Sequence, residues 1–276
     1  MTTPYADEVL VLADGRRMAW AEWGDPRGLP LVLLHPCPGS RLLCPDLAAT
    51  TAAGVRLITV DRPGYGRSDP VAEPTLASFA HDLERLLDHL WLGQIGVVGW
   101  SCGGQYAMAC AAILAERVSG VALLATPAPD NELRWLPPSF RHVAELAKHD
   151  PQRALAAADE VAARLAAGPD AAGRGQPEER QALTAMWAEA FQAGAGGLVA
   201  DMVATSRDWG FAPSSVRART ALIYGDDDPI INLTHGRWWA EALPLAELSI
   251  RPGSGQSVPF VAWADVLRAV AESPQR

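Results

Sequence analysis

The chain has 276 residues, of which 49% are hydrophobic and 20% are charged. This composition excludes a disordered, collagen-like or disulfide-dense protein, and the length suits one large domain or one domain with an insertion. The net charge of −9, with no basic stripe, argues against nucleic-acid binding and against docking on an anionic membrane. No stretch reaches the roughly 18 uninterrupted apolar residues of a membrane span.

The N-terminal residues and the cysteines give an indication of the cellular compartment. The first 15 residues are acidic and lack the apolar core of a signal peptide. The four cysteines show no CxxC spacing, which favours reduced thiols over a metal site or disulfides. We therefore expect a cytoplasmic protein with no metal and no cofactor. The cysteines are Cys37, Cys44, Cys102 and Cys110.

Strands and helices alternate in the first half of the chain. Asp14-Gly15 is a hairpin signal between two β patterns, and Thr75 caps a helix with one apolar face. A second helix is expected from about Ser101 to Ala115. The predicted strands cover residues 8–12, 16–23, 31–35, 55–60, 95–100 and 118–125. Apolar strands that alternate with helices indicate a parallel sheet covered on both faces.

The alternation stops between about residues 126 and 217. Asp150-Pro151 begins an Ala-rich helix, residues 178–193 form a second helix, and no strand pattern is visible. Strands at 220–224 and 246–250 and helices at 234–243 and 258–271 follow. The prediction is an α/β fold with about eight mostly parallel strands. Its core would comprise residues 1–127 and 215–276, and residues 128–214 would form an inserted helical lid.

The clearest chemical motif is Gly99-Trp100-Ser101-Cys102-Gly103, which lies where a strand meets a helix. A tight strand-to-helix turn raises the serine above the sheet edge and tolerates only small neighbours. The turn also places Ser101 at a helix N-terminus, where free N–H groups favour a developing negative charge. Ser101 is therefore the predicted nucleophile.

With these motifs the chain resembles the α/β-hydrolase superfamily, over nearly its whole length. The segment 35–40, His-Pro-Cys-Pro-Gly-Ser, resembles the family's oxyanion loop, and 61–68, Asp-Arg-Pro-Gly-Tyr-Gly-Arg-Ser, resembles its glycine-rich turn. The segment 225–229, Gly-Asp-Asp-Asp-Pro, resembles the one that carries the triad acid. The nearest resemblance is to proline iminopeptidases, small esterases and C–C hydrolases. It implies the α/β-hydrolase fold and a Ser-Asp-His triad.

The oxyanion loop departs from the family pattern at Pro36, which stands where a glycine is usual. Because proline has no N–H, the donors implied by the resemblance are the backbone N–H groups of Cys37 and Cys102. The side chains of both cysteines are read as small fillers near the site. The polar residues of the turn after residue 60 are read as hydrogen-bonding groups that fix it. These residues are Asp61, Arg62 and Asp69.

A larger departure concerns the triad histidine. Gln256 occupies the position that the family gives to it, and glutamine cannot take up a proton near neutral pH. The implied acid is Asp228, with its neighbours Asp226 and Asp227 left open and Asp130 as a further alternative. No other histidine is expected to replace the base. The candidates are His35, His81, His89, His142, His149 and His235.

Four residues are assigned to substrate binding. His35 ends a strand beside the oxyanion loop, although a bracing role there is the simpler interpretation. Trp100 lies beside the nucleophile, and Trp135 and Trp187 lie in the predicted lid, where they would line an apolar pocket. For each tryptophan taken singly, core packing is the simpler interpretation.

The sequence thus predicts a serine hydrolase for a mainly apolar small-molecule ester, amide or related acyl substrate. As written the chain should be inactive or substrate-trapping, because Gln256 replaces the general base. One alternative is a receptor-like protein that binds a ligand without catalysis. Another is a cyclase or lyase that uses the serine and the oxyanion hole alone. An epoxide hydrolase or dehalogenase is disfavoured, because those enzymes need Asp where Ser101 stands.

Overall fold

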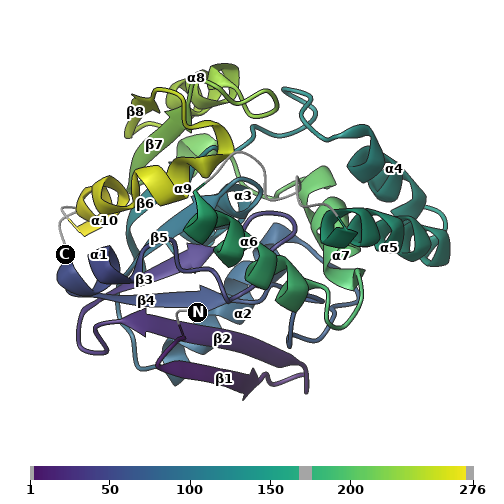
Figure 1. The fold of residues 1–276 in the computed structure, drawn as a ribbon, viewed down its shortest axis with the longest axis horizontal. Coiled ribbons are helices and arrows are strands. Elements are labelled where there is room, and N and C mark those ends of the chain that lie inside the picture. Colours follow the sequence, from purple (N-terminus) through teal and green to yellow (C-terminus); the bar gives the residue numbers. More distant parts are fainter. Residues whose placement is uncertain (1–2, 168–175, 272–276) are drawn as a thin grey trace.

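The computed structural model describes residues 3–167 and 176–271, and its centre is one eight-stranded sheet (Figure 1). The strands are β1 (Ala6–Val11), β2 (Arg17–Gly24), β3 (Leu29–Leu34), β4 (Val55–Val60), β5 (Ile95–Trp100), β6 (Val118–Leu124), β7 (Arg219–Gly225) and β8 (Ala246–Arg251). Their order is β1-β2-β4-β3-β5-β6-β7-β8. β2 pairs antiparallel with β1 and β4, and the other pairs are parallel. The predicted number and direction of the strands are confirmed.

The described helices follow the alternation that the sequence predicts, with three additions. They are α1 (Leu47–Ala52), α2 (Leu76–His89), α3 (Gly103–Ile113), α4 (Pro138–Ala147), α5 (Pro151–Ala167), α6 (Pro177–Ala190), α7 (Gly196–Ser206), α8 (Leu233–Ala242), α9 (Val258–Val261) and α10 (Trp263–Ala271). The additions are α1, α4 and α7. The single helix expected at 258–271 is divided into α9 and α10, with Ala262 outside both. No helix in the described part of the chain is long and apolar enough to cross a membrane.

The core consists of two apolar layers, one on each face of the sheet. α3 packs on β5 and β6, α8 packs on β7, and α2 packs against α3. On the opposite face α1 packs on β4, and α10 packs on β5 and β6. All six residues of β5 are buried, as expected for a central parallel strand covered on both sides. The carboxyl end of β5 is therefore held rigidly, and the residue that follows it is Ser101.

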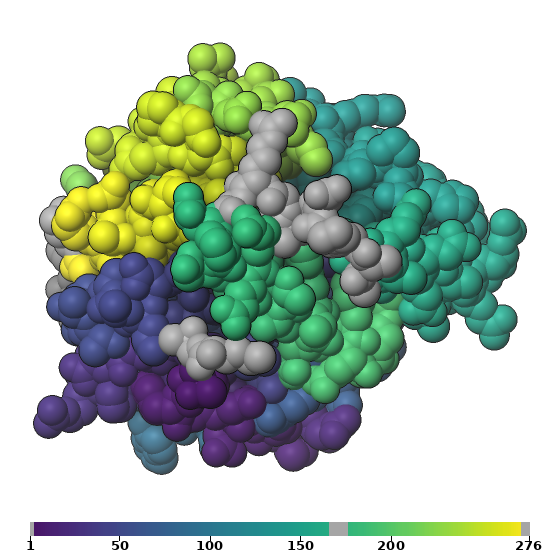
Figure 2. Space-filling view, viewed as in Figure 1, coloured from purple at the N-terminus to yellow at the C-terminus, as the bar shows by residue number. Residues whose placement is uncertain are grey.

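Helices α4 to α7 lie between β6 and β7 in the chain and pack mainly on one another (Figure 1, Figure 2). α6 is tied to the sheet region, because Leu183 and Met186 join the apolar layer that contains β3 and β5. The hydroxyl of Ser40 also donates to the Met186 carbonyl at 2.8 Å. These helices fall within the predicted lid at 128–214, of which residues 168–175 lie outside the described residues.

Candidate active site

Ser101 lies in the sharp turn between β5 and α3, with a backbone φ of 52°. Its N–H donates to the Leu124 carbonyl at 2.8 Å, and its carbonyl accepts from the Gly104 N–H at 2.9 Å. A Cβ atom at Gly99 would collide with the backbone of Gly104. A positive φ on a residue other than glycine is strained, and such strain concentrates at functional sites. The turn therefore has the backbone geometry that the motif predicts.

A cavity of about 490 Å³ opens above this turn, between the strand ends and the inserted helices. Of the predicted site residues, Ser101, Gln256, Cys37, Trp100 and Trp187 line it. The other lining residues are Pro36, Pro38, Phe140, Leu165, Glu179, Leu183, Asp227, Pro229, Gly253, Ser254, Gly255 and Ser257. Four stretches far apart in sequence thus meet over the serine: the loop after β3, the loop after β7, the loop after β8, and α4 to α6.

Asp228 holds the Gln256 side chain directly. Gln256 Nε2 donates a short hydrogen bond to Asp228 Oδ2, while Asp228 Oδ1 accepts from the N–H groups of Ile230 at 2.9 Å and Ile231 at 2.8 Å. Asp228 is only 4% exposed. With Nε2 bonded to Asp228, the remaining polar atom of the amide is its carbonyl oxygen. That oxygen can accept a hydrogen bond but cannot be protonated near neutral pH.

The other acids left open by the sequence have different surroundings. Asp226 is exposed and accepts from the Gly253 N–H at 2.6 Å. Asp130 accepts from two backbone N–H groups and from Arg141. Asp227 lines the cavity but is exposed. Asp228, which is buried and hydrogen-bonded to Gln256, is therefore the acid that orients this side chain.

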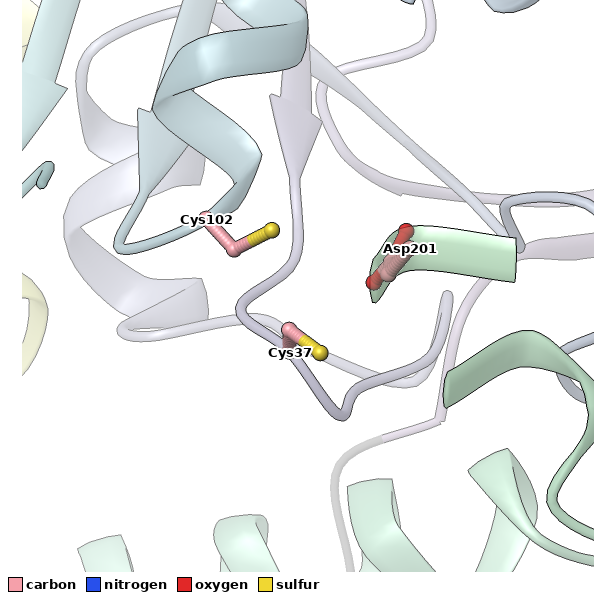
Figure 3. A group of neighbouring side chains, drawn as sticks. All are labelled: Cys37, Cys102 and Asp201. Atoms are coloured by element: carbon pink, nitrogen blue, oxygen red, sulfur yellow. The ribbon is translucent and has the colours of Figure 1, made fainter. Parts of the chain in front are cut away.

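The two cysteines of the predicted oxyanion hole lie next to each other (Figure 3). The sulfur atoms of Cys37 and Cys102 and a carboxylate oxygen of Asp201 all lie within 4.8 Å of one another. Burial raises the pKa of the Cys37 thiol well above its ordinary value, and the neighbouring Cys102 adds to that effect. A thiol in this setting stays protonated, which suits a small apolar filler.

Asp201 already has its hydrogen-bonding capacity filled. Arg62 Nε donates to Oδ1 at 2.9 Å and Arg62 Nη2 to Oδ2 at 2.5 Å, while the hydroxyls of Tyr106 and Tyr65 donate at 2.8 and 3.0 Å. A metal ion placed between Asp201 and the cysteines would meet the Arg62 guanidinium. The donor set is therefore a poor cation site.

His35 and Trp135, assigned above to substrate binding, do not line the cavity. His35 is buried, its Nδ1 bonds to the Pro36 carbonyl at 2.7 Å, and its Nε2 accepts from the Arg62 N–H at 3.3 Å. Burial and the Arg62 charge hold the pKa of His35 well below its ordinary value. His35 therefore braces the loop after β3. Trp135 belongs to the buried apolar layer that also contains Val143 of α4.

No histidine within the described residues lines the cavity. The remaining candidate near the sheet edge is His235, whose Nδ1 accepts from the Ala128 N–H at 3.1 Å. Burial lowers its pKa, although Asp228 acts in the opposite sense. Because Nδ1 of the neutral His235 ring accepts the hydrogen bond from the Ala128 N–H, that nitrogen is not free to take up a proton. The described part of the chain thus places no imidazole base beside Ser101.

Glu179 lines the cavity although its sequence context is unremarkable. It lies in the first turn of α6, where acidic residues are ordinary helix stabilisers. It is 8% exposed, and its Oε1 accepts from the Ser257 hydroxyl at 2.5 Å. Burial raises its pKa, and the Ser257 hydrogen bond offsets part of that rise. Only the packing of α6 over the sheet edge brings this carboxylate to the cavity.

Comparison with known proteins yields one family and several relatives. The sequence pattern of the family described as "alpha/beta hydrolase fold" matches residues 30–262. A proline iminopeptidase from Neisseria gonorrhoeae is 31% identical over 48% of this chain and 44% of its own length. A probable proline iminopeptidase from Streptomyces coelicolor is 35% identical over 43% of this chain and 41% of its own. In each case the match spans less than half of the relative.

The fold agreement extends over nearly the whole chain. A thermophilic esterase from Thermogutta terrifontis superposes with a TM-score of 0.70 at 24% identity, covering 97% of this chain and 97% of its own. At this identity the likeness concerns the fold.

Proposed function

Because the chain belongs to the α/β-hydrolase fold family, we propose that the cavity above Ser101 is the active site of a serine hydrolase whose general-base position is held by Gln256. The substrate class is a mainly apolar small-molecule ester, amide or related acyl compound. The observation that carries the proposal is the hydrogen bond from Gln256 to Asp228 beside the same cavity as Ser101. In a Ser-His-Asp triad the acid orients its neighbour by a hydrogen bond of this kind, so the contact supports the proposal.

In this proposal Ser101 Oγ attacks the substrate carbonyl carbon. The oxyanion that forms would accept hydrogen bonds from the backbone N–H groups of Cys37 and Cys102, with the N-terminus of α3 adding a favourable dipole. The serine proton has to leave during the attack, and the Gln256 amide cannot take it. The chain as written should therefore bind an acyl compound and turn it over very slowly.

The inserted helices supply the substrate-facing wall. Phe140 of α4, Leu165 of α5 and Trp187 of α6 line the cavity opposite the loops of the sheet edge. We propose on this basis that residues 128–214 act as a lid on a core of residues 1–127 and 215–276. Their apolar side chains favour an apolar acyl or alcohol group.

A receptor-like protein without catalysis is the second candidate, and the same glutamine favours it. A cavity of about 490 Å³ is within the usual size of small-molecule sites. Such a protein would keep the pocket and would gain nothing from a proton acceptor at position 256.

The test compares p-nitrophenyl butyrate hydrolysis by the unaltered chain, Gln256→His, Gln256→Asn, and the double variant Ser101→Ala with Gln256→His. We expect a gain of at least roughly 10³-fold in Gln256→His alone, since triad members act as a unit. Its activity should rise between about pH 6 and 8 as the imidazole loses its proton. Gln256→Asn controls for a change of size without a base. A Gln256→His variant that folds, binds the ester and gains no turnover would contradict the hydrolase and favour the receptor.

A further inference from the structure

The loop after β3 offers a single backbone donor to the cavity. Pro36, Cys37 and Pro38 line the cavity, and proline has no N–H group. The N–H of Cys37 is therefore the only backbone donor among these three residues. Within the described residues no acceptor is bonded to it. This is the N–H group that the proposed function assigns to the oxyanion.

The direction of this N–H is fixed by the carbonyl of the same peptide unit. The peptide bond between Pro36 and Cys37 is trans, so the Pro36 carbonyl and the Cys37 N–H point in opposite directions. The carbonyl accepts from Arg62 Nη2 at 3.0 Å and from His35 Nδ1 at 2.7 Å. Neither Arg62 nor His35 lines the cavity. The carbonyl is thus turned toward the buried side of the loop, and the N–H toward the side that faces the cavity.

Arg62 can hold this carbonyl because several contacts fix its own position. It is fully buried, and its Nε and Nη2 atoms donate to Asp201 at 2.9 and 2.5 Å. Its Nη1 donates to the His35 carbonyl at 2.5 Å, and its guanidinium carbon lies 4.7 Å from the centre of the Tyr106 ring. A planar guanidinium held by a carboxylate in this way presents its remaining donors in fixed directions.

Reversal of the peptide between residues 36 and 37 would exchange the two directions. The Pro36 carbonyl oxygen would then face the cavity and would repel a developing oxyanion instead of stabilising it. Loss of one donor from an oxyanion hole costs roughly 10²- to 10³-fold in kcat. The reversal would also break the hydrogen bonds from Arg62 and His35 to a buried carbonyl, which is costly away from water.

We propose that Arg62 is a positioning residue for the oxyanion hole: through the Pro36 carbonyl it directs the Cys37 N–H at the reacting carbonyl oxygen. The inference rests on the proposed function for the identity of the hole. Arg62 itself lies outside the cavity lining and acts only through the loop. A residue of the turn after β4 thereby sets the geometry of a loop 26 residues earlier in the chain.

The experiment observes the donor directly. The full chain is labelled with [¹⁵N]cysteine, which gives one backbone amide signal for each of its four cysteines. The signals of Cys37 and Cys102 are identified by their loss in Cys37→Ser and Cys102→Ser. The probe is ethyl butyrate, a neutral ester that the unaltered chain should hydrolyse very slowly.

Two variants remove the hydrogen bond from Arg62 to the Pro36 carbonyl. Arg62→Lys keeps a positive charge beside Asp201, but one ammonium cannot replace the fork of the guanidinium. Arg62→Met combined with Asp201→Asn removes both charges together, so that neither is left buried alone. The matched control is Tyr106→Phe, which removes a donor 2.8 Å from Asp201 and leaves the contact between Arg62 and Pro36 in place.

In the unaltered chain and in Tyr106→Phe, ethyl butyrate should move the amide protons of Cys37 and Cys102 downfield. In both Arg62 variants the Cys102 signal should still move, whereas the movement of the Cys37 signal should be lost. The signals of Cys44 and Cys110, which lie outside the cavity lining, should not respond to the ester in any of these chains. A general disturbance of the fold would change these two signals as well, so they separate a structural effect from a local one.

A kinetic measurement supports the same distinction. In the Gln256→His background, Arg62→Lys should lower kcat for p-nitrophenyl butyrate by roughly 10- to 100-fold and change KM by less than about threefold. The reason is that the donor acts mainly on the oxyanion and little on the bound ester. Tyr106→Phe should leave both constants within about twofold.

Two failures can be told apart. If the ester moves the Cys37 signal equally in the unaltered chain and in the Arg62 variants, the role of Arg62 is wrong and the proposed function stands. If millimolar ester moves neither the Cys37 nor the Cys102 signal in the unaltered chain, the cavity holds no ester carbonyl at these N–H groups, and both proposals fail.

Discussion

Two buried aspartates near the turn at Ser101 have different surroundings. Asp201 of α7 is 1% exposed and receives the Arg62 guanidinium and two tyrosine hydroxyls. Asp228, after β7, is 4% exposed and receives two backbone N–H groups and the amide of Gln256. Within the described residues no salt bridge joins Asp228 to a cation.

Under the proposed function, the difference separates a structural carboxylate, Asp201, from the carboxylate that would act in the reaction, Asp228. The charge of Asp201 is neutralised by Arg62, which also donates to the carbonyls of His35 and Pro36, so the pair joins α7 to the loop after β3. The charge of Asp228 stays available to orient and stabilise whatever residue stands at position 256. In a triad that residue becomes a cation during the reaction, and a carboxylate without a prior salt bridge can stabilise it.

The largest effect is expected for Asp228→Asn in the Gln256→His background. Without the carboxylate the imidazole loses its correct tautomer and its counter-charge. We predict that kcat for p-nitrophenyl butyrate falls by roughly 10³- to 10⁴-fold, as for the equivalent change in a serine protease. The same substitution in the unaltered chain should change turnover little. An unchanged kcat when Asp228→Asn is added to Gln256→His would show that Asp228 is not the triad acid.

The next effect concerns stability. Here the larger loss is expected at Asp201 and the smaller one at Asp228. Asp201→Ala leaves the fully buried Arg62 guanidinium without its counter-charge, which should lower the free energy of unfolding by about 3–5 kcal/mol. Asp228→Ala uncaps two backbone N–H groups and should cost only about 1–2 kcal/mol. Urea unfolding of both variants measures the difference. Equal losses in the free energy of unfolding would contradict the idea that only Asp201 neutralises a buried cation.

The sequence predicts one of these aspartates and not the other, for a physical reason. Asp228 follows a recognisable strand and precedes Pro229, so its position is encoded locally. The partners of Asp201 are 95 to 139 residues distant in sequence, and no local sequence pattern predicts them. α7 itself, Gly-Gly-Leu-Val-Ala-Asp-Met-Val-Ala-Thr-Ser, contains weak helix formers and is fixed by burial.

The helices and strands show the same contrast between features that local sequence predicts and features that depend on packing. The strand at 55–60 and the helix capped by Thr75 are predictable with their observed starts, because apolar periodicity and a capping side chain define them. The inserted helices are predictable only in part. The position of Glu179 in the cavity and of Trp135 outside it depends on how α4 and α6 pack over the sheet. The spacing of residues along the chain does not predict how these helices pack over the sheet.

A smaller effect is expected from the pH dependence of stability at Glu179. Burial raises its pKa in the folded chain above the ordinary value of 4.5, so the protonated form favours folding. This contribution is present at low pH and is lost as the pH rises through the folded pKa. Glu179→Gln should remove that dependence, gaining less than about 1 kcal/mol at pH 7 relative to pH 4. Urea unfolding at the two pH values checks it, and a gain confined to low pH would contradict the sign.

The smallest effect is expected for Ser101→Ala in the unaltered chain. Without a proton acceptor at position 256 the serine contributes little, so residual hydrolysis should change by no more than about twofold. A large loss in the Ser101→Ala rate of p-nitrophenyl butyrate hydrolysis would reveal an unidentified base. Glu179 would then be the first group to substitute, because it is the buried carboxylate that lines the cavity.

The central claim is that the site around Ser101 is complete except for a proton acceptor at position 256. Its most direct test is labelling with a fluorophosphonate probe, followed by intact mass and peptide mapping, on the unaltered chain and on Gln256→His. We predict rapid labelling of Ser101 in Gln256→His, little labelling of the unaltered chain over the same time, and none when Ser101→Ala is added. Equal labelling of the unaltered chain and Gln256→His at Ser101 would contradict it, because the serine would then be activated without a histidine.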